Sequence, residues 1–358
     1  MQRWIRTLAA AFALAVGLSA TTRASELTDS LKKGTPELKS AGQLAFGPDG
    51  VLFVGDTAGT TVFAISTGDV KGDSKAALKV EKLAEKIGAM LGASGADITI
   101  NDMKVNPASG NLYLSIARGK GAAGMPAIVK LDRASGKLSQ FELKEVPFAS
   151  TKVGAASGKD PTVAITGLVF AKGNLYLAGQ TNEEFASTFR VIPVPFKDKG
   201  KGTSIEIYHA AHAKLETNSP IRTFTIIDIA NEANLLASYT CTPLVKIPLD
   251  SLKPGEKVKG TTVAELGNQN KPMDMVPYTK DGKQFVLMTN TKHGLIKVKL
   301  EGIDKVEPLV APVRGGGVAG LAYDKISELK DVVQIDKLDA ERFVYLSKDG
   351  TLDTVPLP

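Results

Sequence analysis

Residues 100–132 read INDMKVNPASGNLYLSIARGKGAAGMPAIVKLD, and they contain one complete copy of a unit that recurs through the chain. Alternating apolar and polar residues predict three strands, at residues 101–106, 111–117 and 127–131. Pro107 and Gly110 bound the turn between the first two strands, as is typical of a tight antiparallel connection. Three short strands in this order form a small sheet that needs neighbouring sheets to bury its faces.

The same pattern returns five more times, so the chain is a repeat protein. Asn-Leu-Tyr-Leu follows a glycine at residue 111 and again at residue 174. Asp-Gly separates apolar runs at residues 49–50, 281–282 and 349–350, which is a strong hairpin signal. Six small sheets repeated in this way predict an all-β, six-bladed β-propeller. The five further copies lie at residues 42–65, 165–196, 221–249, 273–300 and 317–357.

Three insertions interrupt the repeat. Apolar residues at helical spacing predict an amphipathic helix within residues 67–94, and residues 133–160 carry an outer strand and a polar loop. Five or seven blades stay compatible with the pattern, since an irregular blade could lie in either stretch. In the last copy, residues 317–324 are the expected inner strand and residues 325–342 a long insertion. That copy lacks a fourth strand, so we expect an N-terminal segment within residues 25–39 to close the ring beside its edge.

The first 24 residues have the order of a signal peptide. Arg3 and Arg6 precede the apolar run at residues 8–18, and Thr22 to Ala24 supply a small-x-small cleavage site. The run is too short to span a bilayer as a helix. We therefore expect a signal peptide at residues 1–24, a single propeller domain at residues 25–358 and an exported protein, periplasmic or secreted, without a membrane span.

Charge and cofactor motifs narrow the function. Removing the leader removes three arginines and no acid, so the formal charge falls from +6 to +3. The lysines alternate with acids instead of clustering with aromatic residues, which argues against a nucleic-acid partner. The single cysteine, Cys241, forms no internal disulfide and no CxxCH haem motif is present. Trp4 is the only tryptophan and lies in the leader, which disfavours a quinone oxidoreductase.

Propeller geometry brings distant loops together. The loop after the second strand of a blade emerges on the same face as the loop that leads into the next blade. Polar residues at these positions either pair with one another or await a polar ligand. Cys241 is either a thiol at the mouth of the channel or a small buried residue. The candidate ligand-binding residues are Asn101, Asp102, Arg222, Cys241, Asp274 and Asn290.

The three histidines of the chain map to that face as well. His209, His212 and Glu216 form the pattern HxxHxxxE, which would direct three ligands to one side of a helical turn and suits a divalent metal ion as cofactor. His293 would be a fourth ligand or a proton carrier. On a strand, however, positions three apart point to opposite sides, and the histidines would then serve as hydrogen-bonding residues.

The blade motif NDMKVNPASGNLYLS at residues 101–115, with AFGPDGVLFVGD at residues 45–56, resembles the six-bladed SMP-30/gluconolactonase and NHL-like propellers. In the lactonases this resemblance implies a central divalent metal held by a Glu, an Asn and an Asp from different blades. The corresponding positions here are Gly42 with Gln43, Thr166 and Asp274. Asn101 and Asp102 match the motif on the substrate side.

Two functions follow from these patterns. The first is an exported binding or scaffold propeller whose polar, histidine-bearing face holds a small molecule, a peptide or another exported protein. The second is a metal-dependent hydrolase, similar to a lactonase, with either HxxHxxxE or Asp102 with Asp274 as the ion site. The sequence names neither the ligand nor the reaction.

Overall fold

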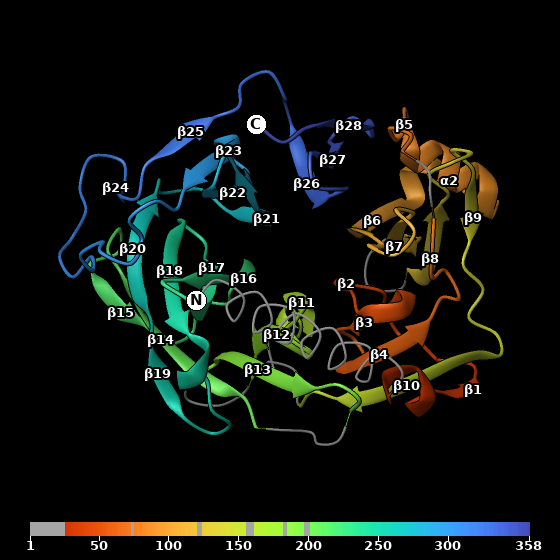
Figure 1. Cartoon of the computed structure of the whole chain (residues 1–358), viewed down its shortest axis with the longest axis horizontal. Coiled ribbons are helices and arrows are strands. Elements are labelled where there is room, and N and C mark those ends of the chain that lie inside the picture. The colour runs from red at the N-terminus through yellow and green to blue at the C-terminus, as the bar shows by residue number, and fades with distance from the viewer. Residues whose placement is uncertain (1–25, 73–74, 120–123, 155–160, 182–184, 197–200) are drawn as a thin grey trace, which may run out of the picture.

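The chain folds as a six-bladed β-propeller in a computed structural model, which describes residues 26–72, 75–119, 124–154, 161–181, 185–196 and 201–358. Six antiparallel sheets surround a central channel (Figure 1). The expected signal peptide lies outside the described residues. Within them, no helix combines the length and apolar character that a membrane crossing requires. The predicted fold class and blade number are confirmed.

The first three sheets are numbered by the chain order of their inner strands. The first sheet contains β2 (Leu44–Phe46), β3 (Val51–Asp56), β4 (Thr61–Ser66), β10 (Val146–Lys152) and β1 (Lys32–Gly34). The second contains β6 (Ile98–Val105), β7 (Leu112–Arg118), β8 (Met125–Leu131) and β9 (Leu138–Gln140). The third contains β11 (Gly167–Ala171), β12 (Asn174–Gln180), β13 (Ser187–Pro193), β14 (Thr203–His209), β15 (Lys214–Glu216) and β19 (Lys257–Lys259).

The remaining sheets follow the same plan, with the first-named strand lining the channel. The fourth contains β16 (Thr223–Ile229), β17 (Glu232–Ser238), β18 (Pro243–Pro248), β20 (Thr261–Leu266) and β24 (Val318–Gly320). The fifth contains β21 (Pro272–Lys280), β22 (Lys283–Asn290), β23 (Gly294–Lys299) and β25 (Tyr323–Lys325). The sixth contains β26 (Val332–Lys337), β27 (Arg342–Ser347), β28 (Leu352–Pro356) and β5 (Lys79–Val80).

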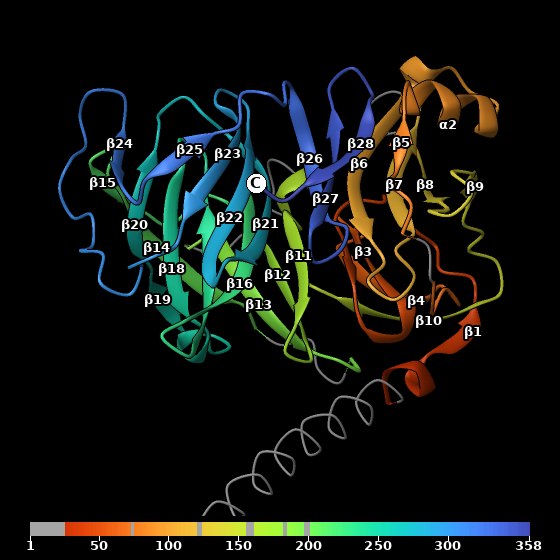
Figure 2. The ribbon, with the colours of Figure 1, turned by 45° about the horizontal axis from the view of Figure 1, so that its top comes forward.

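Local sequence signals explain most of these elements. Asp49 and Gly50 turn the chain between β2 and β3 with φ angles of 53° and 66°, the left-handed values that an Asp-Gly hairpin adopts. The helix predicted within residues 67–94 is α2 (Leu83–Leu91), which ends at Gly92 in the left-handed conformation. Its buried residues Leu83 and Ile87 pack in the core shared by the second and sixth sheets (Figure 2). Short 3-10 turns occur at η1 (Pro48–Gly50), η2 (Gly95–Asp97), η4 (Pro161–Val163) and η5 (Leu249–Ser251).

The sheets do not follow one another around the ring in chain order. The inner strands pack in the sequence β2, β11, β16, β21, β26, β6 and back to β2. The chain therefore builds the first sheet, steps to the second, returns past the first and then runs around the other side. The sixth sheet closes the ring against the second sheet, not the first (Figure 1).

The predicted closure of the last blade by residues 25–39 is wrong. The edge strand β28 pairs with β5, through Leu352 opposite Val80. The N-terminal strand β1 instead pairs with β10 at the outer edge of the first sheet. The reason is the order of the sheets around the ring: the segment that leads from the first to the second sheet passes the exposed edge of the sixth, and it covers that edge.

The assignment of the last inner strand is also corrected. Residues 317–324 do not line the channel: β24 extends the fourth sheet and β25 extends the fifth. The inner strand of the sixth sheet is β26, inside the stretch expected to be an insertion. Val332 and Ile335 of β26 are buried, whereas Val318 of β24 is 56% exposed, so burial of apolar surface favours the observed arrangement.

Candidate functional site: a charged channel and a histidine cluster

The central channel has a volume of about 770 Å³, and inner strands of all six sheets line it. Of the residues predicted to bind a ligand, Asn101, Asp102 and Asp274 line this channel. Gln43 and Thr166, at positions that the family resemblance singles out, line it too. Three of the six residues predicted to bind a ligand thus lie in the channel lining.

A buried ion cluster occupies one level of the channel. Lys104 of β6 extends its ammonium to 3.6 Å from Asp102 and 3.5 Å from Asp274. Asp336 of β26 is the third carboxylate that acts on Lys104. The side chain of Lys104 is 19% exposed, so its ammonium group loses most of its contact with water in the folded chain. Such a charge is stable only when partners compensate it.

Each carboxylate of the cluster also connects two neighbouring sheets. Asp102 accepts a hydrogen bond from the backbone N–H of Leu44, at 2.7 Å. Asp336 accepts one from Val105 at 2.7 Å, and Asp274 accepts one from Ile335 at 3.1 Å. The inner strand of a blade has no strand on its channel side, so its N–H groups need such acceptors.

Burial shifts the pKa values of this cluster. Burial raises the pKa of Asp102 to about 6, although the Lys104 ammonium opposes the shift. Burial likewise raises the pKa of Asp336 to about 6, and the Lys104 ammonium again opposes the shift. Burial alone would lower the pKa of Lys104, but the three carboxylates outweigh it and hold the ammonium protonated above its usual range. The cluster thus contains a permanent cation and two carboxyls that exchange protons just below neutral pH.

Apolar side chains form part of the wall around the ion cluster. Phe46, Phe170, Ile226 and Pro277 come from four different sheets and are partly exposed to the channel. Ligand sites commonly combine apolar walls with a few fixed polar groups. The channel has both features at once, and the charges are concentrated on the side formed by the second, fifth and sixth sheets.

Lys104 and Asp336 were not among the predicted site residues. A signal for Lys104 was present, because residues 102 and 104 are two apart on one strand and point to the same face. Asp336 was hidden by the wrong assignment of residues 325–342 as an insertion. Their partner Asp102 was identified, but the ion cluster requires the spatial order of the sheets, which the sequence pattern does not contain.

Three predicted residues lie away from the channel. The Arg222 Nε donates a hydrogen bond to Thr240 Oγ1 at 3.0 Å. Cys241 adopts a left-handed turn conformation, with φ of 63°, and its N–H bonds to the carbonyl of Asn270. Asn290 is buried and accepts a hydrogen bond from Asn270 at 3.0 Å. These residues organise the loops of the fourth and fifth sheets and do not join the channel lining.

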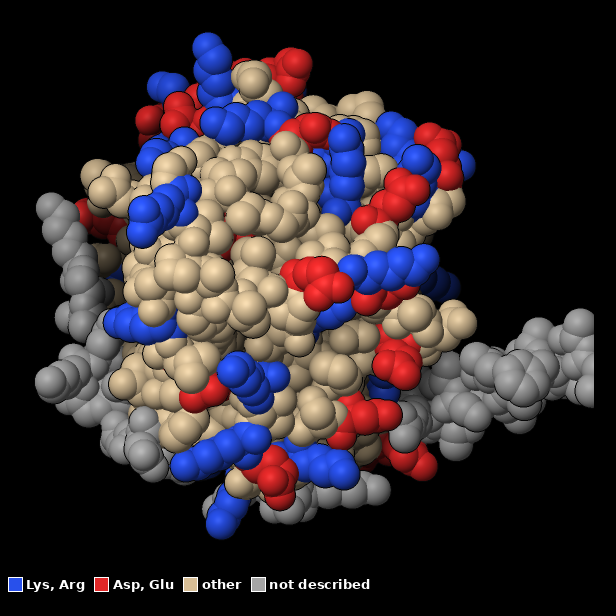
Figure 3. All heavy atoms as spheres, turned by 90° about the vertical axis from the view of Figure 1, so that its left-hand side faces the viewer, with Lys and Arg blue, Asp and Glu red and all other residues tan. Residues whose placement is uncertain are grey.

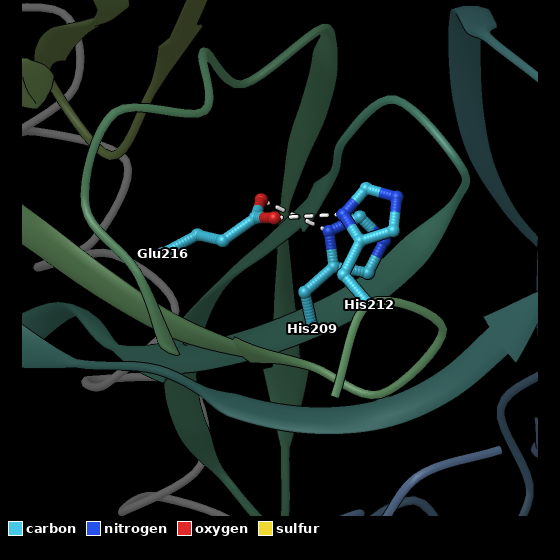
Figure 4. A group of neighbouring side chains, drawn as sticks. All are labelled: His209, His212 and Glu216. Atoms are coloured by element: carbon cyan, nitrogen blue, oxygen red, sulfur yellow. Dashed lines mark hydrogen bonds and ion pairs between the residues drawn. The ribbon is translucent and has the colours of Figure 1, made fainter. Parts of the chain in front are cut away.

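The second candidate site is the histidine cluster, defined as His209, His212 and Glu216. His209 Nδ1 lies 2.9 Å from one oxygen of Glu216, and His212 Nδ1 lies 2.7 Å from the other (Figure 4). The two imidazole rings lie against each other with their centroids 3.8 Å apart and their planes tilted by 37°. Potential ligand atoms of the three residues all lie within 4.8 Å of one another.

The β14–β15 hairpin creates this geometry. Glu216 pairs with Ile207, so it shares a face with His209, which is two residues further along β14. A four-residue turn then folds His212 back over His209, and Ala213 takes a left-handed φ of 57° to close it. His209 thus lies at the end of a strand and His212 lies in the turn that follows. The two alternatives that the sequence left open, a helix and a continuous strand, are both replaced by this hairpin.

Charge is unevenly placed in the histidine cluster. Burial would raise the pKa of Glu216, but hydrogen bonds from His209, Ser219 and His212 lower it to about 2. Burial lowers the pKa of His209, which is 1% exposed. The result at neutral pH is a carboxylate beside a neutral buried imidazole, and His209 Nε2 has no hydrogen-bond partner among the described atoms.

His293 does not belong to this cluster. It packs against Tyr323, with ring centroids 5.9 Å apart, and lies over Gly267, where a side chain would meet its Nε2. It lines a separate cavity of about 310 Å³ beside Asn290 and Lys292. The structure therefore brings together three of the four predicted metal ligands and places the fourth elsewhere.

Comparisons with known proteins assign no relationship. No family model matches the chain, and no curated protein matches it. The PQQ-bound aldose sugar dehydrogenase of Streptomyces coelicolor is 11% identical over 91% of this chain and 96% of its own, with a TM-score of 0.36. The plexin A4 extracellular region is 10% identical over 92% of this chain and 40% of its own, with a TM-score of 0.42. Likenesses this distant carry no argument about ligand or activity, and the six-bladed fold stands on the strand pairing of the chain itself.

Proposed function

We propose that this chain is an exported binding protein whose channel holds a small molecule with an apolar body and a cationic group. The observation that carries the proposal is the ion cluster, in which Lys104 faces Asp102, Asp274 and Asp336 between apolar walls. With all four groups ionised, three negative charges face one positive charge. A ligand cation would offset the excess where water cannot screen it.

The protonation states favour a cation over an anion. Asp102 and Asp336 have pKa values of about 6, so at neutral pH both are ionised and already close to taking up protons. A bound cation would stabilise their ionised forms, whereas a bound anion would oppose them. The apolar residues around the cluster suit a hydrocarbon or aromatic body and would supply affinity through burial.

The same geometry supports binding over the hydrolase hypothesis at Asp102 and Asp274. The Lys104 ammonium lies within 3.6 Å of both carboxylates and so takes the place that a divalent ion would need. The pKa of Lys104 is raised above its usual range, which makes this amine a hydrogen-bond donor and a poor nucleophile.

Three probes of one shape test this proposal: phenethylamine, phenethyl alcohol and phenylpropionate. Calorimetric titration should show the tightest binding for the amine at pH 7.5 and weaker binding at pH 5, where Asp102 and Asp336 are protonated. Asp274→Asn should weaken amine binding by at least about tenfold, which is 1.4 kcal/mol. Asp324→Asn, at an ion pair with Lys299 that is half-exposed, is the matched control and should bind like the wild type. Equal affinity for the three probes, or for the two variants, would contradict a cation site.

Export is the second part of the proposal and has its own test. The order of Arg3, Arg6, the apolar run and Ala24 supports cleavage of a leader. Intact-mass measurement on protein from a periplasmic or culture fraction should give a chain that begins near Ser25. Recovery of the full-length chain from the cytoplasm alone would contradict export and leave the cation site untouched.

A further inference from the structure

The histidine cluster lies on the outer part of the propeller, away from the channel. His209 ends β14, the fourth strand of the third sheet, and the hairpin continues into β15 (Figure 1). Glu265 of the fourth sheet holds the turn, since its carboxylate accepts the N–H groups of Ala210 and Ala211 at 2.7 and 3.2 Å. None of the three cluster residues lines the channel. Any function of this site is therefore independent of the ion cluster.

The ligand atoms are close to the spacing that a metal ion needs. Zinc binds imidazole nitrogen and carboxylate oxygen at about 2.0–2.2 Å, so tetrahedral ligand atoms lie about 3.3 Å apart. The two nitrogen–oxygen distances in the cluster are 2.9 and 2.7 Å. These two distances must lengthen by about half an ångström to reach the zinc spacing, and His212 has room to move because its side chain is 42% exposed and lies in the turn.

The chemistry of the three groups is also that of a metal site. Metal ions bind neutral imidazole and ionised carboxylate. Here the Nδ1 atoms of two imidazoles face the two oxygens of one carboxylate at 2.9 and 2.7 Å. Ser219 donates to the same Glu216 oxygen as His209 and fixes the carboxylate. Hydrogen-bonded support of this kind orients ligands in metal sites.

We propose that His209, His212 and Glu216 bind one divalent first-row cation, with zinc the best fit. Two imidazoles and one carboxylate provide three protein ligands, and the exposed side of His212 leaves a further position open to water or an external carboxylate. The side of the molecule on which β15 and β24 lie carries scattered charges of both signs rather than a dense acidic patch (Figures 1 and 3). Selectivity would therefore come from the nitrogen ligands and not from general attraction of cations.

Cobalt(II) provides the direct test, because its visible spectrum reports the ligands that it binds. The full chain, freed of metal by a chelator, should bind one equivalent of Co²⁺ with a spectrum typical of tetrahedral or five-coordinate nitrogen–oxygen ligation. Zn²⁺ should displace it. His212→Ala should lower Zn²⁺ affinity by at least about 100-fold, since loss of a mere supporting partner already costs 10–100-fold.

Two further variants keep the test decisive. Glu216→Gln keeps the size of the side chain and should also abolish the cobalt spectrum. His293→Ala removes the histidine outside the cluster and should bind both ions like the wild type. The proposal is overturned if wild type and His212→Ala bind equally, or if His293→Ala loses the ion as well. Thermal unfolding of each variant separates loss of the site from loss of the fold.

Discussion

At the scale of single residues, Lys104 is the cation at the centre of the ion cluster. Its ammonium is mostly buried, and three carboxylates from three sheets surround it. Removing one member of a buried ion cluster usually costs more than forming the cluster gains, because the remaining charges lose their compensation. The ion cluster thus makes the stability of the channel depend on one side chain.

Lys104→Met should therefore lower the free energy of unfolding by about 3–5 kcal/mol at pH 7.5. The loss should be smaller at pH 5, because Asp102 and Asp336, whose pKa values are about 6, then take up protons. Chemical denaturation measures both values. Lys299→Met is the control: it breaks a surface pair with Asp324 at 3.2 Å, where about 1 kcal/mol or less is expected. A Lys104 variant as stable as this control would show that the ammonium is not needed.

Asp336 should give a distinct pH dependence. Its pKa is raised from 3.8 to about 6 in the folded chain, so the folded state holds a proton that the unfolded state has already released. A raised carboxyl pKa means that stability falls as pH rises from about 4 to 6. Asp336→Asn removes this dependence. The variant should therefore gain stability relative to the wild type across that range, by up to about 3 kcal/mol.

The measurement for Asp336 is the difference between the two unfolding free energies at each pH. The difference cancels groups outside the ion cluster, such as His209, which titrate in both proteins, and keeps the response of Asp336 and the cluster around it. A difference that stays constant from pH 4 to 7 would contradict the assigned pKa. If the unfolding free energy of the variant minus that of the wild type decreases as pH rises, folding lowers the pKa of Asp336 and does not raise it.

At the scale of elements, the short strand β5 forms the outer edge of the sixth sheet. It has two residues, yet it covers the edge of β28 and so completes the sixth sheet. Thr354 extends this contact, since its hydroxyl accepts a hydrogen bond from the Leu78 N–H at 2.8 Å and donates one to the Leu78 carbonyl at 2.9 Å. Two backbone groups beside the strand pair thus depend on one hydroxyl.

Thr354→Val keeps the shape of the side chain and removes both hydrogen bonds. We expect a loss of about 1–3 kcal/mol, the usual cost of leaving buried polar groups unpaired. Thr354→Ser retains the hydroxyl and should lose less. Thermal and chemical unfolding of the two variants decide the matter. If Val is tolerated as well as Ser, the β5 contact contributes little to the last blade.

Some of these elements could be predicted from the sequence and others could not. Hairpins with Asp-Gly turns and the amphipathic α2 were predictable, because their signals lie within a few residues. The pairing of Val80 with Leu352 was not, since two residues of an edge strand carry no periodicity and their partner is distant in the chain. The same limit hid Asp336, whose role appears only when the sixth sheet lies beside the second.

At the scale of the whole molecule, strands are exchanged between some neighbouring blades and not between others. β10 follows the second sheet in the chain and pairs with the first sheet. β5 lies between the first and second sheets in the chain and pairs with the sixth sheet. These two strands link the sixth, second and first sheets. On the other side, β19 comes between two strands of the fourth sheet and joins the third, and β24 comes between two strands of the fifth sheet and joins the fourth. Among the described residues, no strand is exchanged between the first and third sheets or between the fifth and sixth.

This division predicts two cooperative units within one ring. The sixth, second and first sheets should open together, and the third, fourth and fifth should open together, because an exchanged strand cannot leave one sheet without exposing the edge of another. The test is hydrogen exchange measured at a series of denaturant concentrations below the unfolding transition. The amides of β2–β4, β6–β8 and β26–β28 should share one free energy of opening. Those of β11–β13, β16–β18 and β21–β23 should share a second one. A single value for all six sheets, or a boundary that separates the first sheet from the second, would contradict the coupling, since the strands that pass between these two sheets are the ones that tie the group together.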